Sequence, residues 1–277
     1  MLRSFVVCTF LIPSLALSAD GEISGGRLGH ILQLQPESHI LSASDEDFAV
    51  FRSFSDKNPI SPTFGTELCI VEALNRNSSL KVKETRVDGD TEEIYEKSVP
   101  TGAIAGMTGG FFGVSNKGNS VPLGLVKVEG KVKNRMHPWN SGGIVETNRT
   151  SVNILPIKKF QDSNFIVNAL QSKPLLIESG KDGIRSKTFD RFDRSAVATT
   201  SDGQIIFIVL FEPGGRAASL DEFSHLLLRF KTSKGGSIKW ALAMDGGPGA
   251  HLYVPKMKKH CGAPTFNYVP NLLYLEK

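Results

Sequence analysis

The sequence lacks the short motifs by which several large enzyme classes are recognised. Its 277 residues contain no G-x-S-x-G elbow, no P-loop, no H-E-x-x-H helix and no paired C-x-x-C. The acidic runs at 45–47 and 90–93 also lack the ligand spacing of a calcium loop. The sequence therefore gives no support for an α/β-type serine hydrolase, a P-loop NTPase or a metal site of these kinds. We predict neither a metal nor another cofactor.

A strong excess of charge of either sign is absent as well. The formal net charge is +4, from 32 basic and 28 acidic residues, and the basic residues do not interleave with aromatics along a stripe. Nucleic-acid-binding domains usually present such a basic face. The densest basic run, residues 256–260, is expected to be a solvated loop. Nucleic acid is therefore not expected as a partner.

Long apolar runs are absent beyond the first twenty residues. There, Arg3 precedes an apolar segment over 5–17, which Pro13 interrupts, and small residues extend to Ala19. This pattern is typical of a secretory signal peptide, and the segment is too short to cross a bilayer comfortably. We predict a signal peptide over 1–19, no transmembrane segment in the mature chain, and a secreted or periplasmic protein. A retained N-terminal anchor is the alternative.

Cysteine is scarce, with three residues in the whole chain. Signal cleavage would leave Cys69 and Cys261, which can form one disulfide in an oxidising compartment. That bond would close nearly the whole domain and stabilise it by about 4–5 kcal/mol at most on the chain-entropy view. Two buried free thiols are the alternative, and the sequence leaves it open.

Glycine and proline, by contrast, are plentiful, with 27 and 14 residues, which indicates many turns and short strands. Hairpins are predicted where apolar segments flank residues 129–130, 148–149 and 201–203. Ser219 and Glu222 have the spacing of a capping box and predict a helix over 220–231. A second helix is predicted from residue 162 or 163 to about 171.

These elements predict one α+β domain with a mixed, mostly antiparallel sheet or sheets and few helices. The strand at 204–211, the helix at 220–231 and the strand at 238–244 are expected to form one parallel, right-handed β-α-β unit near the C-terminus. Residues 20–99 form the strand-rich N-terminal part of this domain, and residues 100–277 form its core.

Two predicted strands end at doubled glycines. The apolar strand up to Met244 ends at Asp245, which Gly246 and Gly247 follow. Ligands bind at strand ends in open sheets, and glycine lets them approach the backbone amides closely. Asp245 is therefore a candidate catalytic carboxylate, and the two glycines are candidate substrate contacts. Taken alone, the same residues are more typical of a simple tight turn.

The second such strand end lies within residues 103–113. Thr108 precedes Gly109 and Gly110, and Phe111 and Phe112 follow them. We expect the glycines to line a cleft and the phenylalanines to pack under the loop, which makes all five candidate substrate-binding residues. A place in the core is an equally good interpretation for either phenylalanine, but it does not explain why the glycine is doubled.

Charged residues near other strand ends complete the candidate site. Arg194 begins a predicted strand, where a guanidinium can bind a phosphate through two parallel hydrogen bonds. A surface ion pair with Asp193 is the alternative. Glu178 ends another strand and is a second candidate carboxylate. His251 is a candidate acid or base, whereas His137 is better interpreted as structural.

Taken in order over residues 100–277, these motifs resemble the phosphodiester glycosidase family. The matching segments are Thr-Gly-Gly-Phe-Phe at 108–112, Pro-Leu-Gly-Leu at 122–125, Lys-Pro-Leu-Leu-Ile at 173–177, Arg-Ser-Ala at 194–196, Asp-Gly at 202–203, the capped helix, Asp-Gly-Gly at 245–247 and Val-Pro-Asn at 269–271. Two places depart from the family pattern. Thr108 stands where an amide side chain is usual, and Pro-Gly-Ala at 248–250 replaces small hydroxyl residues.

The resemblance implies a secreted hydrolase that cleaves the bond between a sugar's anomeric carbon and a phosphodiester, in glycan or cell-envelope polysaccharide metabolism. Such a reaction needs a cation and amides for the phosphate and a carboxylate for the oxocarbenium-like centre or its attacking water. By this resemblance Arg194 binds the phosphate and Asp245 is the leading carboxylate. Glu178 is the reserve carboxylate, and His251 assists the leaving oxygen.

Two alternatives to this activity stay open. A non-catalytic carbohydrate- or envelope-binding domain on the same scaffold agrees with the departure at Thr108 and after residue 247. A hydrolase acting on phosphodiesters of envelope polymers or exopolysaccharides is the other. In each case the expected partner is a carbohydrate phosphodiester.

Overall fold

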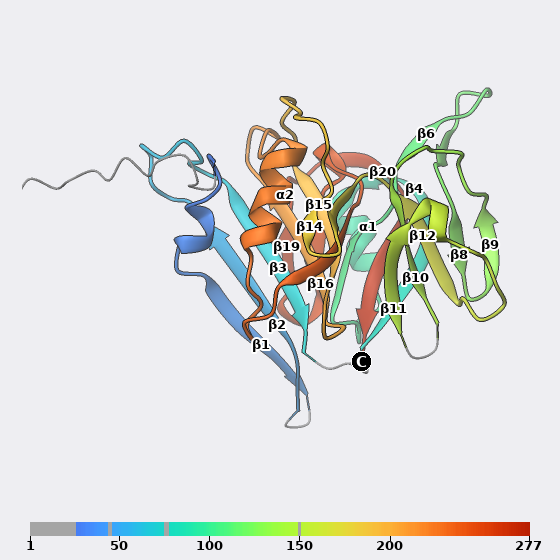
Figure 1. The fold of residues 1–277 in the computed structure, drawn as a ribbon, viewed down its shortest axis with the longest axis horizontal. Helices are drawn as coiled ribbons and strands as arrows, with labels where there is room; N and C mark the ends of the chain where they lie inside the picture. The colour runs from blue at the N-terminus through green and yellow to red at the C-terminus, as the bar shows by residue number, and fades with distance from the viewer. Residues whose placement is uncertain (1–25, 44–45, 75–77, 149–150) are drawn as a thin grey trace, which may run out of the picture.

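Short strands dominate the fold, as the glycine and proline content predicts. The computed structural model describes residues 26–43, 46–74, 78–148 and 151–277, and within them twenty strands and two α-helices form one domain (Figure 1). The predicted α+β class, with mostly antiparallel sheets and few helices, is confirmed. The sheets are not mixed as predicted, because all strand pairs among the described residues are antiparallel. The predicted signal peptide lies outside the described residues. Within those residues no helix is long and apolar enough to cross a membrane.

The largest sheet has eight strands, and each pairs antiparallel with its neighbours. In spatial order these are β1 (Glu37–Ala43), β2 (Glu46–Ser55), β3 (Glu67–Ala73), β16 (Ile205–Phe211), β15 (Arg194–Thr200), β17 (Ile238–Ala243), β13 (Leu175–Glu178) and β14 (Lys181–Asp182).

Two five-stranded antiparallel sheets pack on one face of this large sheet, and we name them after a central strand of each. The β10 sheet contains β11 (Val152–Pro156), β10 (Gly143–Thr147), β12 (Asn168–Ser172), β8 (Val126–Val128) and β9 (Lys131–Asn134). The β5 sheet contains β19 (Lys259–Cys261), β18 (Leu252–Val254), β5 (Ala105–Thr108), β20 (Phe266–Glu276) and β4 (Ser79–Asp90). The short hairpin is β6 (Phe112–Val114) and β7 (Ser120–Pro122).

The middle strands of the large sheet are buried on both faces, which explains the continuous apolar sequence of β16. Successive side chains of a strand point to opposite faces. Ile206 and Ile208 accordingly pack with Phe223 of α2 (Leu220–Arg229), whereas Phe207 and Val209 pack toward the β5 and β10 sheets. The sheet is therefore a central layer between α2 on one side and the two smaller sheets on the other.

Helix α2 begins where its capping sequence predicts. The side chain of Ser219 accepts a hydrogen bond from the Glu222 amide, and the Glu222 carboxylate accepts one from the Ser219 amide. β16 and β17 flank this helix in the chain, and both pair antiparallel with β15, which lies between them. The two strands therefore run in the same direction without pairing with one another.

The predicted helix over 162–171 is wrong. Residues 168–172 form β12 instead, which pairs with β10 on one side and β8 on the other, and all five of its residues are buried. Phe165, an apolar residue within the predicted helix, is 85% exposed. Helix α1 (Thr91–Ser98) was not predicted, although Asp90 caps it by accepting from the Glu93 amide. Four 3-10 turns complete the elements: η1 (Ile31–Gln33), η2 (Ile157–Lys159), η3 (Gly247–Gly249) and η4 (Pro255–Met257).

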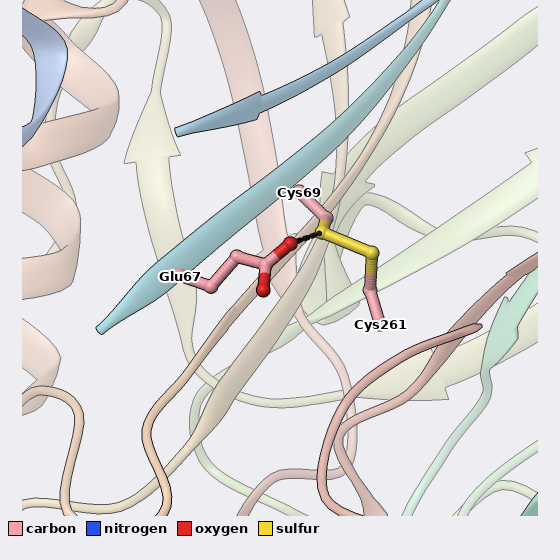
Figure 2. A group of neighbouring side chains, drawn as sticks. All are labelled: Glu67, Cys69 and Cys261. Carbon is pink, nitrogen blue, oxygen red and sulfur yellow. Dashed lines mark hydrogen bonds between the residues drawn. A yellow bond between two sulfur atoms is a disulfide. The ribbon is translucent and has the colours of Figure 1, made fainter. Parts of the chain in front are cut away.

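A disulfide joins the large sheet to the β5 sheet. Cys69 of β3 and Cys261 of β19 are 192 residues apart in sequence, and their Cα atoms are 6.3 Å apart (Figure 2). The side chain of Glu67 lies beside Cys69 (Figure 2). Of the two alternatives that the sequence leaves open, the structure has the disulfide. Because the two sulfur atoms are bonded to one another, neither cysteine is a thiolate that could bind a metal together with Glu67.

Candidate active site

Three neighbouring strands of the large sheet bring the candidate residues to one edge. In the antiparallel pair of β15 and β17, Ala196 lies opposite Ala243. The Met244 amide donates to the Ser195 carbonyl over 3.0 Å, which continues the same register. One further step places Arg194 opposite Asp245. The start of β13 lies at the same edge. The Ala243 amide donates to the carbonyl of Pro174, the residue before β13, over 3.0 Å.

A cavity of about 570 Å³ opens at this edge, and we call it the central cavity. A volume of this size lies within the usual range of small-molecule sites. Arg194 and Asp245 both line it, as do Gly246, Gly247 and Phe111 of the candidate residues. Five candidate residues that come from three distant parts of the sequence thus meet at one cavity.

Asp245 is a buried carboxylate that belongs to this cavity. Burial disfavours its charged form and raises its pKa to about 7, while a hydrogen bond from the Gly246 amide opposes that rise. Its carboxylate lies close to Gly249, where a Cβ atom would come within 2.7 Å of Oδ2. Its carbonyl accepts a hydrogen bond of 2.6 Å from the Ser195 hydroxyl, which fixes the backbone there. The site therefore holds a carboxyl group that exchanges its proton near neutral pH.

Arg194 supplies the cation. Its Nε donates to the Ala218 carbonyl over 2.9 Å, and one Nη donates to the Asp190 carbonyl over 3.0 Å. These bonds orient the group but use only two of its five N–H donors. Within the described residues, no carboxylate lies at ion-pair distance from it, and burial lowers its pKa to about 10. It is a partly desolvated cation that still has donors for an anion. The surface ion pair with Asp193, the alternative that the sequence offered for this residue, is not formed in the described part of the chain.

Lys173 is a second cation at the central cavity, and it was not among the residues predicted for the site. It lies one residue before Pro174, and its Nζ is 4.8 Å from the centre of the Trp139 ring. Trp139 in turn makes an edge contact with Phe111, at 6.5 Å between ring centroids. The sequence signal was present, because Lys173 begins one of the segments that resemble the family.

Two of the glycine amides already have partners, contrary to the expectation that both glycine loops offer theirs to an anion. The Gly110 amide donates to Oδ1 of Asn271 over 2.7 Å. The Gly247 amide donates to the Asp193 carbonyl over 2.8 Å. These bonds hold the two loops in place. The positive charge that faces the central cavity therefore comes from side chains.

The segment around Thr108 lies behind the cavity. Among the described residues, Thr108, Gly109, Gly110 and Phe112 do not line the central cavity. Gly109 packs against Asn271, where a Cβ atom would come within 2.0 Å of Oδ1. The Thr108 side chain accepts from the His251 amide over 2.8 Å, and Phe112 packs edge-on against the Tyr268 ring. This segment supports the site without lining its cavity.

Glu178 and His251 also lie outside the central cavity. Glu178 lines an adjoining cavity on the other side of Pro174. The His251 ring is fully buried, 4.7 Å from the Tyr95 ring centroid, and its Nε2 is 2.9 Å from Nδ1 of His260. Burial is the main cause that lowers the His251 pKa to about 3, so the ring is neutral at physiological pH. The position of His251 does not support a role in protonating the leaving oxygen.

Two buried polar residues hold the site and were not predicted for it, although Asn271 ends one of the segments that resemble the family. Asn271 lies in the middle of β20 and contacts the Gly110 amide from 161 residues away. Asp193 accepts from the Glu212 amide over 3.1 Å, and burial raises its pKa to about 6. Both residues position the backbone around the cavity.

The fold and the cavity define an antiparallel α+β protein with a cationic, carboxylate-containing ligand site at its strand ends. The chain belongs to the phosphodiester glycosidase family, whose sequence model matches residues 101–276. The resemblance found in the sequence is thereby confirmed. No curated protein sequence matches the chain.

Solved structures show the same fold at low sequence identity. The catalytic domain of zebrafish N-acetylglucosamine-1-phosphodiester alpha-N-acetylglucosaminidase, described as auto-inhibited by its pro-peptide, has a TM-score of 0.62 and 16% identity, over 88% of this chain and 89% of that one. A hypothetical protein from Synechocystis has a TM-score of 0.53 and 15% identity, over 87% and 68%. A putative exported protein from Burkholderia pseudomallei K96243 has a TM-score of 0.53 and 10% identity, over 76% and 74%. At these identities the likeness is one of fold.

Proposed function

We propose that the protein hydrolyses the glycosidic bond of a sugar-1-phosphodiester and releases the free sugar and a phosphomonoester. Membership of the family supports the class of reaction. One observation carries the proposal for this chain: Arg194 and Asp245 line the same cavity from the facing ends of β15 and β17. A cation for the phosphate and a carboxyl group for the sugar thus line one cavity.

In the proposed mechanism Arg194 binds the phosphate, and Lys173 adds a second positive charge. Asp245, in its ionised form, accepts a proton from the water that attacks the anomeric carbon. The bond between that carbon and the bridging oxygen breaks, and its electron pair remains on the phosphate. Because the leaving phosphate is a stabilised anion, the reaction depends more on the cations than on a general acid. A carboxyl group with a pKa near 7 is well suited to transfer a proton at neutral pH.

The proposed compartment is extracellular or periplasmic. The Cys69–Cys261 disulfide supports this, because such bonds persist in oxidising compartments. We expect mass spectrometry of the exported protein to find a mature N-terminus just after Ala19. An exported protein that retains Met1 would contradict the proposed cleavage.

The reaction is tested by the position of bond cleavage. The mature protein is incubated in ¹⁸O-water with the benzyl phosphodiester of N-acetylglucosamine 1-phosphate, a sugar suggested by the name of the zebrafish neighbour. Cleavage of the carbon–oxygen bond gives benzyl phosphate without ¹⁸O. A phosphodiesterase acting at phosphorus would give a labelled phosphate product and would overturn the proposal.

Two variants test the assigned cation. Arg194→Gln is expected to reduce kcat/KM by at least about 100-fold, since one charge-assisted contact in a desolvated site contributes about 2.7–4 kcal/mol to the transition state. Lys239→Gln is the control, because it removes a positive charge from an exposed position of the adjacent strand β17. Binding of the diester without any product in the wild type would favour the non-catalytic alternative.

A further inference from the structure

Two more cavities adjoin the central cavity, one on each side. The first, which we call the lysine cavity, has a volume of about 570 Å³ and shares Ser141, Pro174 and Leu220 with the central cavity. The second, the phenylalanine cavity, has a volume of about 940 Å³ and shares Phe192, Gly247 and Pro248 with it. Because each outer cavity shares wall residues with the central cavity, the three form one series with Asp245 and Arg194 in its middle member.

The lysine cavity presents positive charge that the protein itself does not neutralise. Lys158 and Lys159 end the 3-10 turn η2, and Arg185 lies on the loop after β14; all three line this cavity. Among the described residues, none of the three forms an ion pair with a carboxylate, whereas Arg191 and Lys127 elsewhere do. Glu178 is the only acidic residue among the described lining residues. The chemistry of this wall fits a ligand with a further negative group.

The phenylalanine cavity has a different lining. Phe189 and Phe192 are 88% and 49% exposed there, and large apolar side chains that remain exposed beside a cavity are typical of a binding surface. Its charges are mixed: the arginines Arg27, Arg191 and Arg216 occur with Asp190, Asp193 and Glu212. Exposed rings with hydrogen-bonding groups around them are suited to a sugar, which has both apolar and hydroxyl faces.

We infer that the substrate is an oligomer or polymer of sugars joined by phosphodiesters, bound across all three cavities. The inference rests on the proposed function, since it places the scissile linkage at Asp245 and Arg194. A neighbouring phosphate of the chain lies on Lys158, Lys159 and Arg185, and sugar units beyond the central cavity pack on Phe189 and Phe192. Each cavity is large enough for a ligand of its own, so a single sugar phosphodiester fills only the middle of the groove. Because units of the chain are bound on both sides of the scissile linkage, we expect the protein to cleave linkages inside the chain.

The experiment compares two probes in the mature wild-type protein. One is the single benzyl phosphodiester of N-acetylglucosamine 1-phosphate. The other is an oligomer of four N-acetylglucosamine 1-phosphate repeats, in which each phosphate joins the anomeric carbon of one sugar to the C6 hydroxyl of the next. We expect a higher kcat/KM for the oligomer and the early release of fragments longer than one repeat. Release of single repeats alone, from the first turnover onward, would overturn internal cleavage.

A triple variant tests the charged wall. Replacement of Lys158, Lys159 and Arg185 by glutamine is expected to reduce the preference for the oligomer over the single diester by about 10-fold, since three charge contacts are lost. The control replaces three lysines of the β6–β9 region, Lys117, Lys131 and Lys133, and should leave the preference unchanged. If the wild type and the lysine-cavity variant prefer the oligomer equally, the lysine cavity does not bind a neighbouring phosphate.

A binding measurement separates this inference from the proposed reaction. Calorimetry with the oligomer in the Asp245→Asn background measures affinity without turnover. A loss of about 10-fold on adding the lysine-cavity substitutions, but not the control ones, supports the groove even if the wild type hydrolyses neither probe. Equal affinity in all three proteins contradicts the groove whether or not hydrolysis occurs.

Discussion

The chain contains two strand ends of similar sequence, Thr-Gly-Gly at 108–110 and Asp-Gly-Gly at 245–247, and they have different roles. At the first, the space beside Gly109 is filled by Asn271. At the second, a Cβ atom on Gly247 would meet no atom within 4 Å, and the residue lines the central cavity. The first pair allows the backbone to pack closely. In the second pair Gly246 is also packed, since a Cβ atom there would lie 2.8 Å from the Asp193 carbonyl oxygen, and it is Gly247 that leaves room for a ligand. A doubled glycine at a strand end is therefore not in itself a binding signal.

The residues that precede the glycines differ in the same way. Thr108 is tied by hydrogen bonds to Tyr95, Gly249 and His251, so its hydroxyl is occupied by the scaffold. Asp245 has a titratable group whose pKa burial has moved to about 7. The two loops are joined, because the Asp245 amide donates to the Gly109 carbonyl over 2.9 Å. The first strand end thus holds the second in position.

The largest expected effect is a difference in activity between variants of Asp245 and Thr108, the residues that precede the two glycine pairs. Asp245→Asn removes the proposed proton acceptor and is expected to reduce kcat/KM for a sugar-1-phosphodiester by about 10³-fold, within the range for loss of a general base. Thr108→Val, measured on folded protein, should retain activity within about 3-fold and instead lower stability by about 1–3 kcal/mol, because the His251 amide loses its acceptor. Steady-state kinetics and urea unfolding test both. Comparable losses of activity in the two variants would remove the distinction.

The same substitution at Asp245 is expected to make the fold more stable above neutral pH. The Asp245 pKa is raised to about 7 in the folded state from a usual value of 3.8, so its contribution is fully present below about pH 4 and is lost as the pH rises through 7. Asn has no proton to lose. Asp245→Asn should therefore gain a few kcal/mol of unfolding free energy relative to wild type at pH 8, and little at pH 4. Urea unfolding at both pH values measures this, and a gain that does not depend on pH would rule out the buried carboxylate as its cause.

The sequence predicts this contrast only in part, because the contacts that create it are not local. The hairpin of β15 and β16 is predicted since its strands and its Ser-Asp-Gly turn are contiguous, and α2 is predicted from the cap at Ser219. Asn271 lies in a segment that resembles the family, but its contact was not predicted, because its partner Gly110 is 161 residues away. The helix predicted over 162–171 fails for the same reason. Strand β12 is specified by pairing with β8 and β10 on both sides, which no local periodicity records.

The candidate site was likewise predicted only in part. Asp245, Arg194, Gly246 and Gly247 were predicted from strand ends, and they meet because strand ends of neighbouring strands lie at one edge of a sheet. His251 was assigned a role from its nearness in sequence to Asp245. The turn η3 separates the two, and the His251 ring enters the core. Nearness in sequence is therefore a weaker guide in this chain than position on a strand.

A smaller effect, a loss of stability, is expected at Gly109, the glycine that packs against Asn271. In Gly109→Ala the new Cβ atom would lie 2.0 Å from Oδ1 and 2.7 Å from the carbonyl oxygen of Asn271. Backbone or side chain must move, and overpacking of this kind costs about 1–3 kcal/mol. Thermal unfolding should show the loss. The matched control is Gly102→Ala, where no atom lies within 4 Å and no loss is expected. If both variants unfold at the same temperature, Gly109 does not pack tightly against Asn271.

The smallest effect is expected at the glycine that faces the ligand. Gly247 has a φ of +57°, so Gly247→Ala introduces strain of about 1 kcal/mol in the left-handed region, but its side chain meets no neighbour within 4 Å. Gly203→Ala is the matched control, because that hairpin glycine also has a positive φ, +85°, and open space around it. Both variants should lose a similar amount of stability by urea unfolding.

Kinetics then separates the two glycines. The methyl group at position 247 projects at the wall of the central cavity and is expected to raise KM by about 2- to 5-fold with kcat little changed, since it obstructs substrate and transition state alike. The methyl group at position 203 lies in the turn after β15, at the opposite end of that strand from Arg194, and should leave KM unchanged. An equal KM in both variants, at equal stability, would mean that the second glycine pair serves the backbone alone, as the first pair does.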